Sequence, residues 1–342
     1  MRAAILSLLC IIGATAVGVI SGPARPQAVS VVAATPLLVE TPSPVATPSA
    51  TPSATAPPLV TLSNPSLLAQ ELTTKKAHVP AGPSTVVPIL MYHYIRVNPV
   101  ASDRVGFNLS TPPKVFTAQM QYLADNGFHV ISLHEAVVAI QQHRPLPSRP
   151  VVLTFDDGYA DFFTAAVPVL RARGFTATDF VISGRMGVPG FLSAAQVAAA
   201  DQQGFTIGAH TVDHYALATL APARAAWEMR QGKLALESVL GHPVIDFAYP
   251  YGSFNSYAMG EARTLGFETA VSTLVGNVHT SAQLMYLSRL RVGGAMSLAT
   301  FAHLVGGPVP RPSGTPASSP RPTPSPSPTT GVSPAPTRLR TR

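Results

Sequence analysis

The chain of 342 residues has one cysteine, one tryptophan and only 11% charged residues. Because the single cysteine, Cys10, has no partner within the chain, no intramolecular disulfide can form. Residues 85–307 carry no net charge, since 14 basic residues balance 14 acidic ones, and the formal net charge of +7 lies outside them. They contain no basic stripe with interleaved aromatics, which excludes a nucleic-acid-binding core. A stretch of this length buries a substantial core without disulfides.

The two ends of the chain differ from this middle part in composition. Residues 1–22 join Arg2 to an apolar run, which predicts a cleaved signal peptide or a retained membrane anchor. Residues 23–84 and 308–342 are rich in proline, serine and threonine, and we expect solvated spacers there. The basic C-terminal tail is either simply solvated or in contact with cell-wall polymers or a membrane surface. We therefore expect an exported bacterial protein, secreted or tethered to the cell surface.

Residues 85–307 alternate apolar, strand-like runs with helix-like segments. This alternation predicts a parallel sheet covered by helices, either a barrel or a doubly wound fold. In both folds the chemistry gathers at the carboxyl ends of the strands. The expected strands are 86–91, 128–131, 151–155, 178–182, 205–209, 246–249 and 269–272, and the expected helices are 113–126, 133–142, 162–173, 193–203, 222–240 and 256–265.

Two polar clusters follow expected strands and suggest metal chemistry. Asp156 and Asp157 are adjacent carboxylates, which repel each other unless a cation lies nearby, although a helix N-cap pair is the alternative. His210 and His214 are four residues apart, a spacing that on a helical turn places both imidazoles on one face. Two histidines and one carboxylate form the pattern of a catalytic zinc site, and the second carboxylate is then free to act as a base.

These clusters resemble a known family. Thr154-Phe155-Asp156-Asp157-Gly158 together with His210-Thr211-x-x-His214 resembles the polysaccharide deacetylase family, the NodB-homology domain of carbohydrate esterase family 4. Residues 247–252 resemble the third motif of that family, and residues 88–95 resemble its poly-N-acetylglucosamine deacetylase branch. The similarity covers roughly residues 86–305. It implies a distorted (β/α) barrel with an incomplete strand count.

The resemblance also implies a metal site and a set of catalytic roles. Asp157, His210 and His214 match the ligands of a divalent metal, Zn²⁺ first, with Co²⁺ or Ni²⁺ as alternatives. Asp156 matches the general base. The backbone N–H of Tyr251 matches the group that binds the oxyanion, and His93 matches the general acid. The alternative for His93 is a buried structural histidine.

The sequence departs from the family pattern at two places. Ile245 stands where the family often has an arginine that orients the base, and Arg289 or Arg291 is a candidate replacement. The C-terminal L-x-H motif that supplies the acid in many members is absent, because residues 284–292 contain no histidine. This absence shifts the acid role to His93.

Several side chains near the motifs are candidates for contact with a sugar. Tyr92, Tyr249, Pro250 and Arg289 are the predicted substrate-binding residues, and Tyr94 and Tyr159 are further rings that could stack on a pyranose, with ordinary packing as the alternative. Asp179 lies in an expected buried strand without an evident role.

The hypothesis is a metal-dependent N-deacetylase that acts as a monomer on a polysaccharide containing N-acetylglucosamine. Deacetylation of peptidoglycan, chitin oligomers or O-acetylated xylan is the first alternative. A catalytically silent carbohydrate-binding module is the second, although such a module has no need of the adjacent aspartates.

Overall fold

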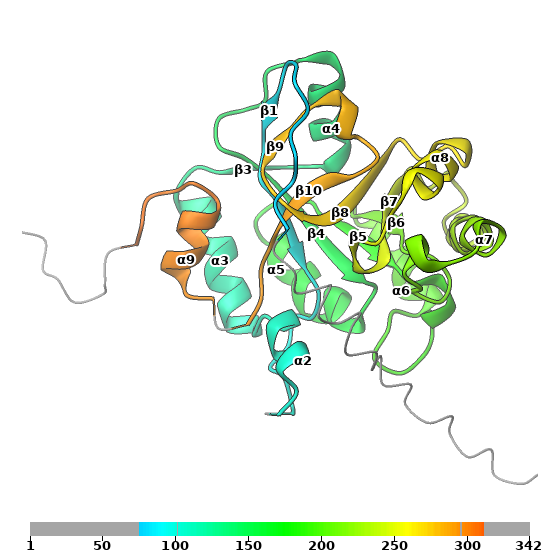
Figure 1. Ribbon diagram of the computed structural model, residues 1–342. Coiled ribbons are helices and arrows are strands. Elements are labelled where there is room, and N and C mark those ends of the chain that lie inside the picture. Colours follow the sequence, from blue (N-terminus) through cyan, green and yellow to red (C-terminus); the bar gives the residue numbers. More distant parts are fainter. Residues whose placement is uncertain (1–74, 101, 295, 311–342) are drawn as a thin grey trace, which may run out of the picture. The chain divides into compact units, whose positions relative to one another are not determined.

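The computed structural model describes residues 75–100, 102–294 and 296–310 (Figure 1). The predicted signal or anchor segment, the spacer up to residue 74 and the tail beyond residue 310 lie outside the described residues. Within the described ranges, no helix has the length and apolar character that crossing a membrane requires.

Seven parallel strands form a closed ring. Each strand is hydrogen bonded to the next, and β4 pairs back with β2, which closes the barrel. The short strand β3 (His129–Ile131) adds to β4 outside the ring. The predicted (β/α) barrel is therefore confirmed, and the doubly wound alternative is wrong. Around the ring the strands are β2 (Ile89–Tyr92), β10 (Leu287–Arg291), β8 (Thr269–Val275), β7 (Asp246–Ala248), β6 (Thr206–Ala209), β5 (Thr178–Val181) and β4 (Pro150–Asp157).

Helices cover the outside of the strands (Figure 1). A second small sheet joins β1 (Thr85–Val86) to β9 (Val278–His279) in antiparallel fashion. The helices are α2 (Arg104–Leu109), α3 (Pro113–Asp125), α4 (Leu133–Gln142), α5 (Val167–Arg171), α6 (Ala194–Gln202), α7 (Pro222–Leu240), α8 (Ser256–Thr264) and α9 (Leu298–Leu304).

Local sequence signals explain where several helices begin and end. Ser132 and Glu135 form a reciprocal capping box at the start of α4. Pro222 occupies the first turn of α7, where its missing N–H costs nothing, and Gly241 ends that helix in the left-handed conformation. The predicted helices 133–142 and 222–240 are confirmed at both boundaries.

The predicted helix 162–173 is interrupted in the structure. Its first part, Phe162–Ala166, is a π-helix, in which the Val167 N–H reaches back to the Phe162 carbonyl, and α5 follows. Pro168 lacks the N–H that would continue the ordinary α-helical bonding, which accounts for a change of register at this point. The sequence pattern also did not predict α2, α9, β9 or β10 as elements.

The two faces of the barrel strands are buried against different partners. One face contributes Ile89, Val152 and Leu287 to an interior apolar cluster, whereas the other face packs beneath the helices in the larger core. Polar side chains occur in sequence where the strands end, at Asp156 on β4 and His210 after β6. The fold therefore gathers the polar motifs at the carboxyl end of the barrel.

Candidate metal centre and active site

Asp156 and Asp157 are the last two residues of β4, not a helix cap, because the next helical segment begins only at Phe162. Asp157 has a positive φ of 81°, which is uncommon for a residue other than glycine. Gly158 follows with a φ of 70°, and a Cβ there would lie 2.9 Å from Cγ1 of Val181 on β5. The turn after the strand therefore requires glycine, and it directs the Asp157 carboxylate away from the strand path.

His210 and His214 lie in a loop after β6 and not on the helical turn that their spacing would also suit. Thr211 has a φ of 65° and His214 a φ of 60°, so two residues of the loop are left-handed. The Thr211 hydroxyl accepts a hydrogen bond of 3.0 Å from the His214 N–H, which closes the loop. The four-residue spacing still brings both imidazoles together, but through this loop geometry.

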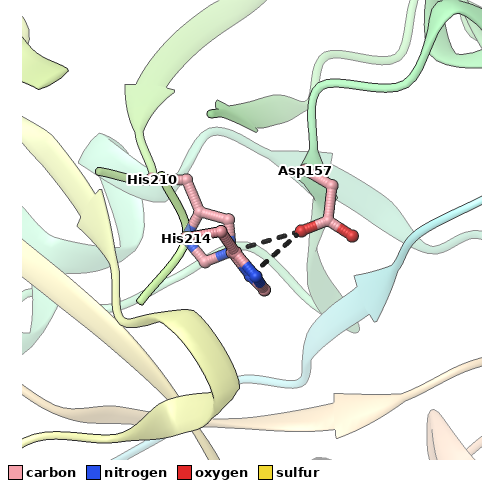
Figure 2. Close-up of side chains that lie close together, drawn as sticks. All are labelled: Asp157, His210 and His214. Atoms are coloured by element: carbon pink, nitrogen blue, oxygen red, sulfur yellow. Dashed lines mark hydrogen bonds and ion pairs between the residues drawn. The ribbon is translucent and has the colours of Figure 1, made fainter. Parts of the chain in front are cut away.

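The three predicted metal ligands meet in one place (Figure 2). Nε2 of His210 lies 3.1 Å from Nε2 of His214. Oδ1 of Asp157 lies 3.4 Å from the His210 Nε2 and 3.3 Å from the His214 Nε2. Ligand atoms about 2.1 Å from one tetrahedral zinc ion lie about 3.4 Å apart. The spacing therefore fits a single divalent cation.

The protonation of this cluster also fits a cation. Nδ1 of His210 lies 2.7 Å from the Ala248 carbonyl oxygen, which can only accept, so Nδ1 carries the proton and the Nε2 lone pair is free. Burial alone would raise the pKa of Asp157, but the neighbouring imidazoles of His210, His214 and His93 outweigh burial and lower it. Its Oδ1 is buried and has no hydrogen-bond partner among the described residues. These are the properties of an ionised carboxylate in need of a cation.

Asp156 is held by an arginine that is distant in sequence. Arg289 on β10 donates to both carboxylate oxygens, with distances of 2.7 Å to Oδ1 and 2.6 Å to Oδ2. Burial raises the pKa of Asp156, but the charge of Arg289 and its hydrogen bonds outweigh burial and lower it. Asp156 is therefore ionised and fixed in orientation, as a general base must be.

Arg289 is itself fully buried and satisfied. Its Nε donates to the Ser272 carbonyl at 3.0 Å and its Nη1 to the Thr154 hydroxyl at 3.0 Å. The side chain is 0% exposed and its contacts are with the protein, and contact of Arg289 with the substrate stays a prediction. Of the two candidates for the residue that orients the base, Arg289 is therefore the one that contacts Asp156. Thr154 was not singled out as a partner, although its position two residues before Asp156 places both on one face of the strand.

His93 and Tyr251 also reach this end of the barrel. His93 directly follows β2, which pairs with β4 at Tyr92 and Phe155, and the charge of His93 lowers the pKa of both Asp156 and Asp157. The Tyr251 ring lies 4.5 Å, centre to centre, from that of His214. Tyr251 sits in the turn after β7 with a φ of 58°.

Two tyrosines and a proline predicted to touch the substrate are buried. Tyr92 is 0% exposed, donates its hydroxyl to Gln119 and packs against Phe155. Tyr249 is 1% exposed, and Pro250 is buried in the following turn. Both rings point into the core because they lie on the outer face or at the end of a strand, so all three side chains pack within the protein, and their contact with a sugar stays a prediction.

Of the two further tyrosines considered, Tyr94 is half-buried and Tyr159 is buried. Their rings stack with centres 3.6 Å apart, and the Arg96 guanidinium lies over the Tyr94 ring. Tyr159 therefore covers one face of the Tyr94 ring and Arg96 covers the other, so neither face is open for stacking on a sugar.

Asp179 on β5 is fully buried, and both carboxylate oxygens have no hydrogen-bond partner among the described residues. Burial, and then the charges of Asp156 and Asp157, raise its pKa well above the ordinary value. Burial and the nearby carboxylates therefore favour the neutral form of Asp179, which lies outside the cluster of Asp157, His210 and His214.

Comparisons with known proteins agree with this geometry. A family model described as polysaccharide deacetylase matches residues 143–270. The chain is 33% identical over 215 residues to YxkH of Bacillus subtilis, which is named after the same family, and the match covers 63% of this chain and 74% of YxkH.

A solved structure and an enzyme with a named substrate add detail. Streptococcus pyogenes deacetylase PplD, solved with acetate, is 30% identical and matches with a TM-score of 0.61 over 65% of this chain and 99% of PplD. The Escherichia coli poly-β-1,6-N-acetyl-D-glucosamine N-deacetylase is 25% identical over 58% of this chain. The match spans only 36% of the length of that enzyme.

Proposed function

Because the chain belongs to the polysaccharide deacetylase family, we propose that it hydrolyses N-acetyl groups of N-acetylglucosamine units in an extracellular or cell-wall polysaccharide, with a divalent cation as cofactor. One observation carries the proposal. The cation cluster of Asp157, His210 and His214 lies beside a carboxylate, Asp156, that a buried arginine keeps ionised. A cation site and an oriented base side by side are what amide hydrolysis by water requires.

The proposed substrate rests on two further supports. The sequence around His93 resembles the poly-N-acetylglucosamine branch, and the Escherichia coli relative is named for poly-β-1,6-N-acetyl-D-glucosamine. The apolar segment in residues 1–22 and the spacer after it support action outside the cytoplasm.

In the proposed mechanism, Asp156 accepts a proton from the water molecule that attacks the acetyl carbonyl carbon. A divalent cation, when bound by Asp157, His210 and His214, polarises the carbonyl and lowers the pKa of water. Arg289 keeps Asp156 ionised before the attack and holds its oxygens in place. The positive charge of Arg289 also offsets the repulsion between the adjacent carboxylates of Asp156 and Asp157.

The remaining steps are assigned to Tyr251 and His93. The backbone N–H of Tyr251 donates to the carbonyl oxygen as it becomes negative. His93, in its protonated form, gives its proton to the amide nitrogen as the carbon–nitrogen bond breaks. Acetate and a free amine are the products, so the polysaccharide gains positive charge.

The test is acetate release from poly-β-1,6-N-acetylglucosamine by the full chain, with Zn²⁺, with a chelator and with the variant Asp156→Asn. We expect release with Zn²⁺, loss of release with chelator, and loss in Asp156→Asn even with Zn²⁺. Release from chitin oligomers, peptidoglycan fragments or acetylated xylan, but not from this polymer, would retain the chemistry and contradict the substrate.

Absence of release from all of these polymers, with cation binding demonstrated, would contradict an enzymatic function. That result would favour the alternative of a carbohydrate-binding module.

A further inference from the structure

Glu228 on α7 is a buried carboxylate outside the proposed catalytic set. Its side chain is 0% exposed, although glutamate is rarely buried to this degree unless it is paired. Oε2 accepts hydrogen bonds from two consecutive backbone N–H groups, those of Val212 at 3.1 Å and Asp213 at 2.9 Å. These two residues lie between His210 and His214, so Glu228 contacts the loop that carries both histidine ligands.

A surface arginine completes the arrangement. Arg224, one turn earlier on α7, donates to Glu228 Oε1 at 2.6 Å and to the Asp213 carboxylate at 2.8 Å. Arg224 therefore neutralises the buried charge of Glu228 and connects helix and loop a second time. A buried carboxylate with two N–H donors and one guanidinium has its acceptor sites satisfied.

Several other backbone groups of the loop are bound as well. The Thr211 and Val212 carbonyls accept from the N–H groups of Ser183 and Gly184, and the His214 N–H donates to the Thr211 hydroxyl. Within this set of contacts, Glu228 is the one charged side chain. The two left-handed residues of the loop cost conformational energy, and such a loop persists only where its surroundings determine it.

We propose that Glu228, supported by Arg224, is a positioning residue that fixes the His210–His214 loop in the shape that binds the cation. The inference rests on the proposed function, since it takes the cluster to be a cation site. Residues that orient metal ligands without touching the metal commonly change metal affinity about 10- to 100-fold when they are replaced. Glu228 reaches the ligands through the backbone between them and not through a ligand side chain.

The same helix offers a matched control. Glu237 also accepts a hydrogen bond from a loop backbone N–H, that of Val244 at 2.9 Å, and also pairs with a basic residue one turn earlier, Lys233 at 2.8 Å. The Val244 loop carries no residue of the cation cluster. Replacement of Glu237 therefore removes a similar helix-to-loop contact without altering the histidine loop.

The experiment measures cation affinity of the full chain, first freed of metal by a chelator. Zn²⁺ affinity is obtained by competition with a chromophoric chelator, and Co²⁺ is used to record the visible absorption spectrum of the site. We expect Glu228→Leu to raise the dissociation constant for Zn²⁺ about 10- to 100-fold and to weaken the Co²⁺ spectrum. We expect Glu228→Gln, whose amide oxygen can still accept from the loop, to recover most of the affinity.

Glu237→Leu should lower the melting temperature but leave the Zn²⁺ dissociation constant and the Co²⁺ spectrum unchanged. Wild-type affinity and spectrum in a folded Glu228→Leu protein would overturn the inference. If Glu228→Leu does not fold, Arg224→Leu decides: a raised dissociation constant supports the inference, and an unchanged one overturns it. If the wild-type protein binds neither cation, the proposed function itself fails, which is a distinguishable result.

Discussion

Arg289 and Asp156 form the most buried ion pair of the site, and removal of one partner leaves the other charged and unpaired. Replacing Arg289 by methionine removes the charge that lowers the pKa of Asp156, so the pKa of Asp156 must rise. The base acts only when ionised, and we therefore expect the acidic limb of the kcat/KM profile to move to higher pH in Arg289→Met. The profile is measured as acetate release against pH.

The lowered pKa of Asp156 also contributes to the stability of the fold, and Arg289→Met removes that contribution. A carboxylate with a lowered pKa stabilises the fold above its ordinary pKa, and this contribution is lost as the pH falls through the lowered value. We expect Arg289→Met to lower the free energy of unfolding at neutral pH by about 3–5 kcal/mol, and Arg171→Met, which removes an exposed contact with Gln203, to change it little. An acidic limb that stays in place would contradict the assignment of Asp156 as the base.

The role of His93 as general acid can be separated from a structural role by comparing substrates with different leaving groups. An amine must be protonated as it leaves, whereas a phenolate with a low pKa need not be. We expect His93→Gln to lower kcat on the polysaccharide about 10²- to 10⁴-fold while hydrolysis of an activated phenyl acetate, measured by absorbance, falls much less. Equal losses on both substrates would show that His93 acts only on structure or on the cation.

At the scale of residues, the motifs predicted which residues form the cluster better than they predicted what surrounds each side chain. Asp157, His210 and His214 meet as predicted, because the motif residues follow parallel strands that end at the same edge. The surroundings of Tyr92 and Tyr249 were left open because the sequence does not tell which face of a short buried strand turns toward the helices. Arg289 was only one of two candidates, since its contact with Asp156 spans 133 positions of sequence.

At the scale of elements, helix α7 packs closely against the loop after β6. Gly232 on α7 faces the loop so closely that a Cβ would lie 2.8 Å from the Thr211 carbonyl carbon. Gly260 on α8 has no atom within 4 Å of the corresponding position. The two glycines lie inside helices but differ in what surrounds them.

This pair gives a matched prediction for alanine. Gly232→Ala must push the loop away, and we expect it to lower the free energy of unfolding by about 1–3 kcal/mol and to weaken Zn²⁺ binding. Gly260→Ala should raise the free energy of unfolding by up to about 1 kcal/mol with unchanged Zn²⁺ binding. Both values come from urea unfolding and a Zn²⁺ titration; equal Zn²⁺ affinity in the two variants would contradict close coupling of α7 to the histidine loop.

Helices with clear caps were predictable, whereas irregular elements were not. The boundaries of α4 and α7 follow from local signals at Ser132 and Gly241. The spacing of His210 and His214 would also suit a helical turn, but the loop has left-handed Thr211 and His214 and is held by contacts from Ser183 and Glu228. Contacts of that kind come from other elements, and a local pattern cannot reveal them.

The whole molecule supplies what no single segment contains. The barrel closes through the pairing of β2 with β4, which sets His93 beside the aspartates, and β10 returns near the end of the domain to place Arg289 against Asp156. The alternation of strands and helices predicted a parallel sheet but left barrel and doubly wound folds open, because it does not reveal the strand order or the β2–β4 pairing that distinguish them. The family resemblance favoured the barrel, which the structure confirms.

The central claim is that one cation at Asp157, His210 and His214 and one base at Asp156 together carry out deacetylation. The most direct measurement determines Zn²⁺ affinity and acetate release for the wild-type chain, Asp156→Asn and His214→Ala. The account predicts that Asp156→Asn binds Zn²⁺ yet releases no acetate, and that His214→Ala loses both. Acetate release by a folded His214→Ala protein without bound cation, or undiminished release by Asp156→Asn, would contradict it.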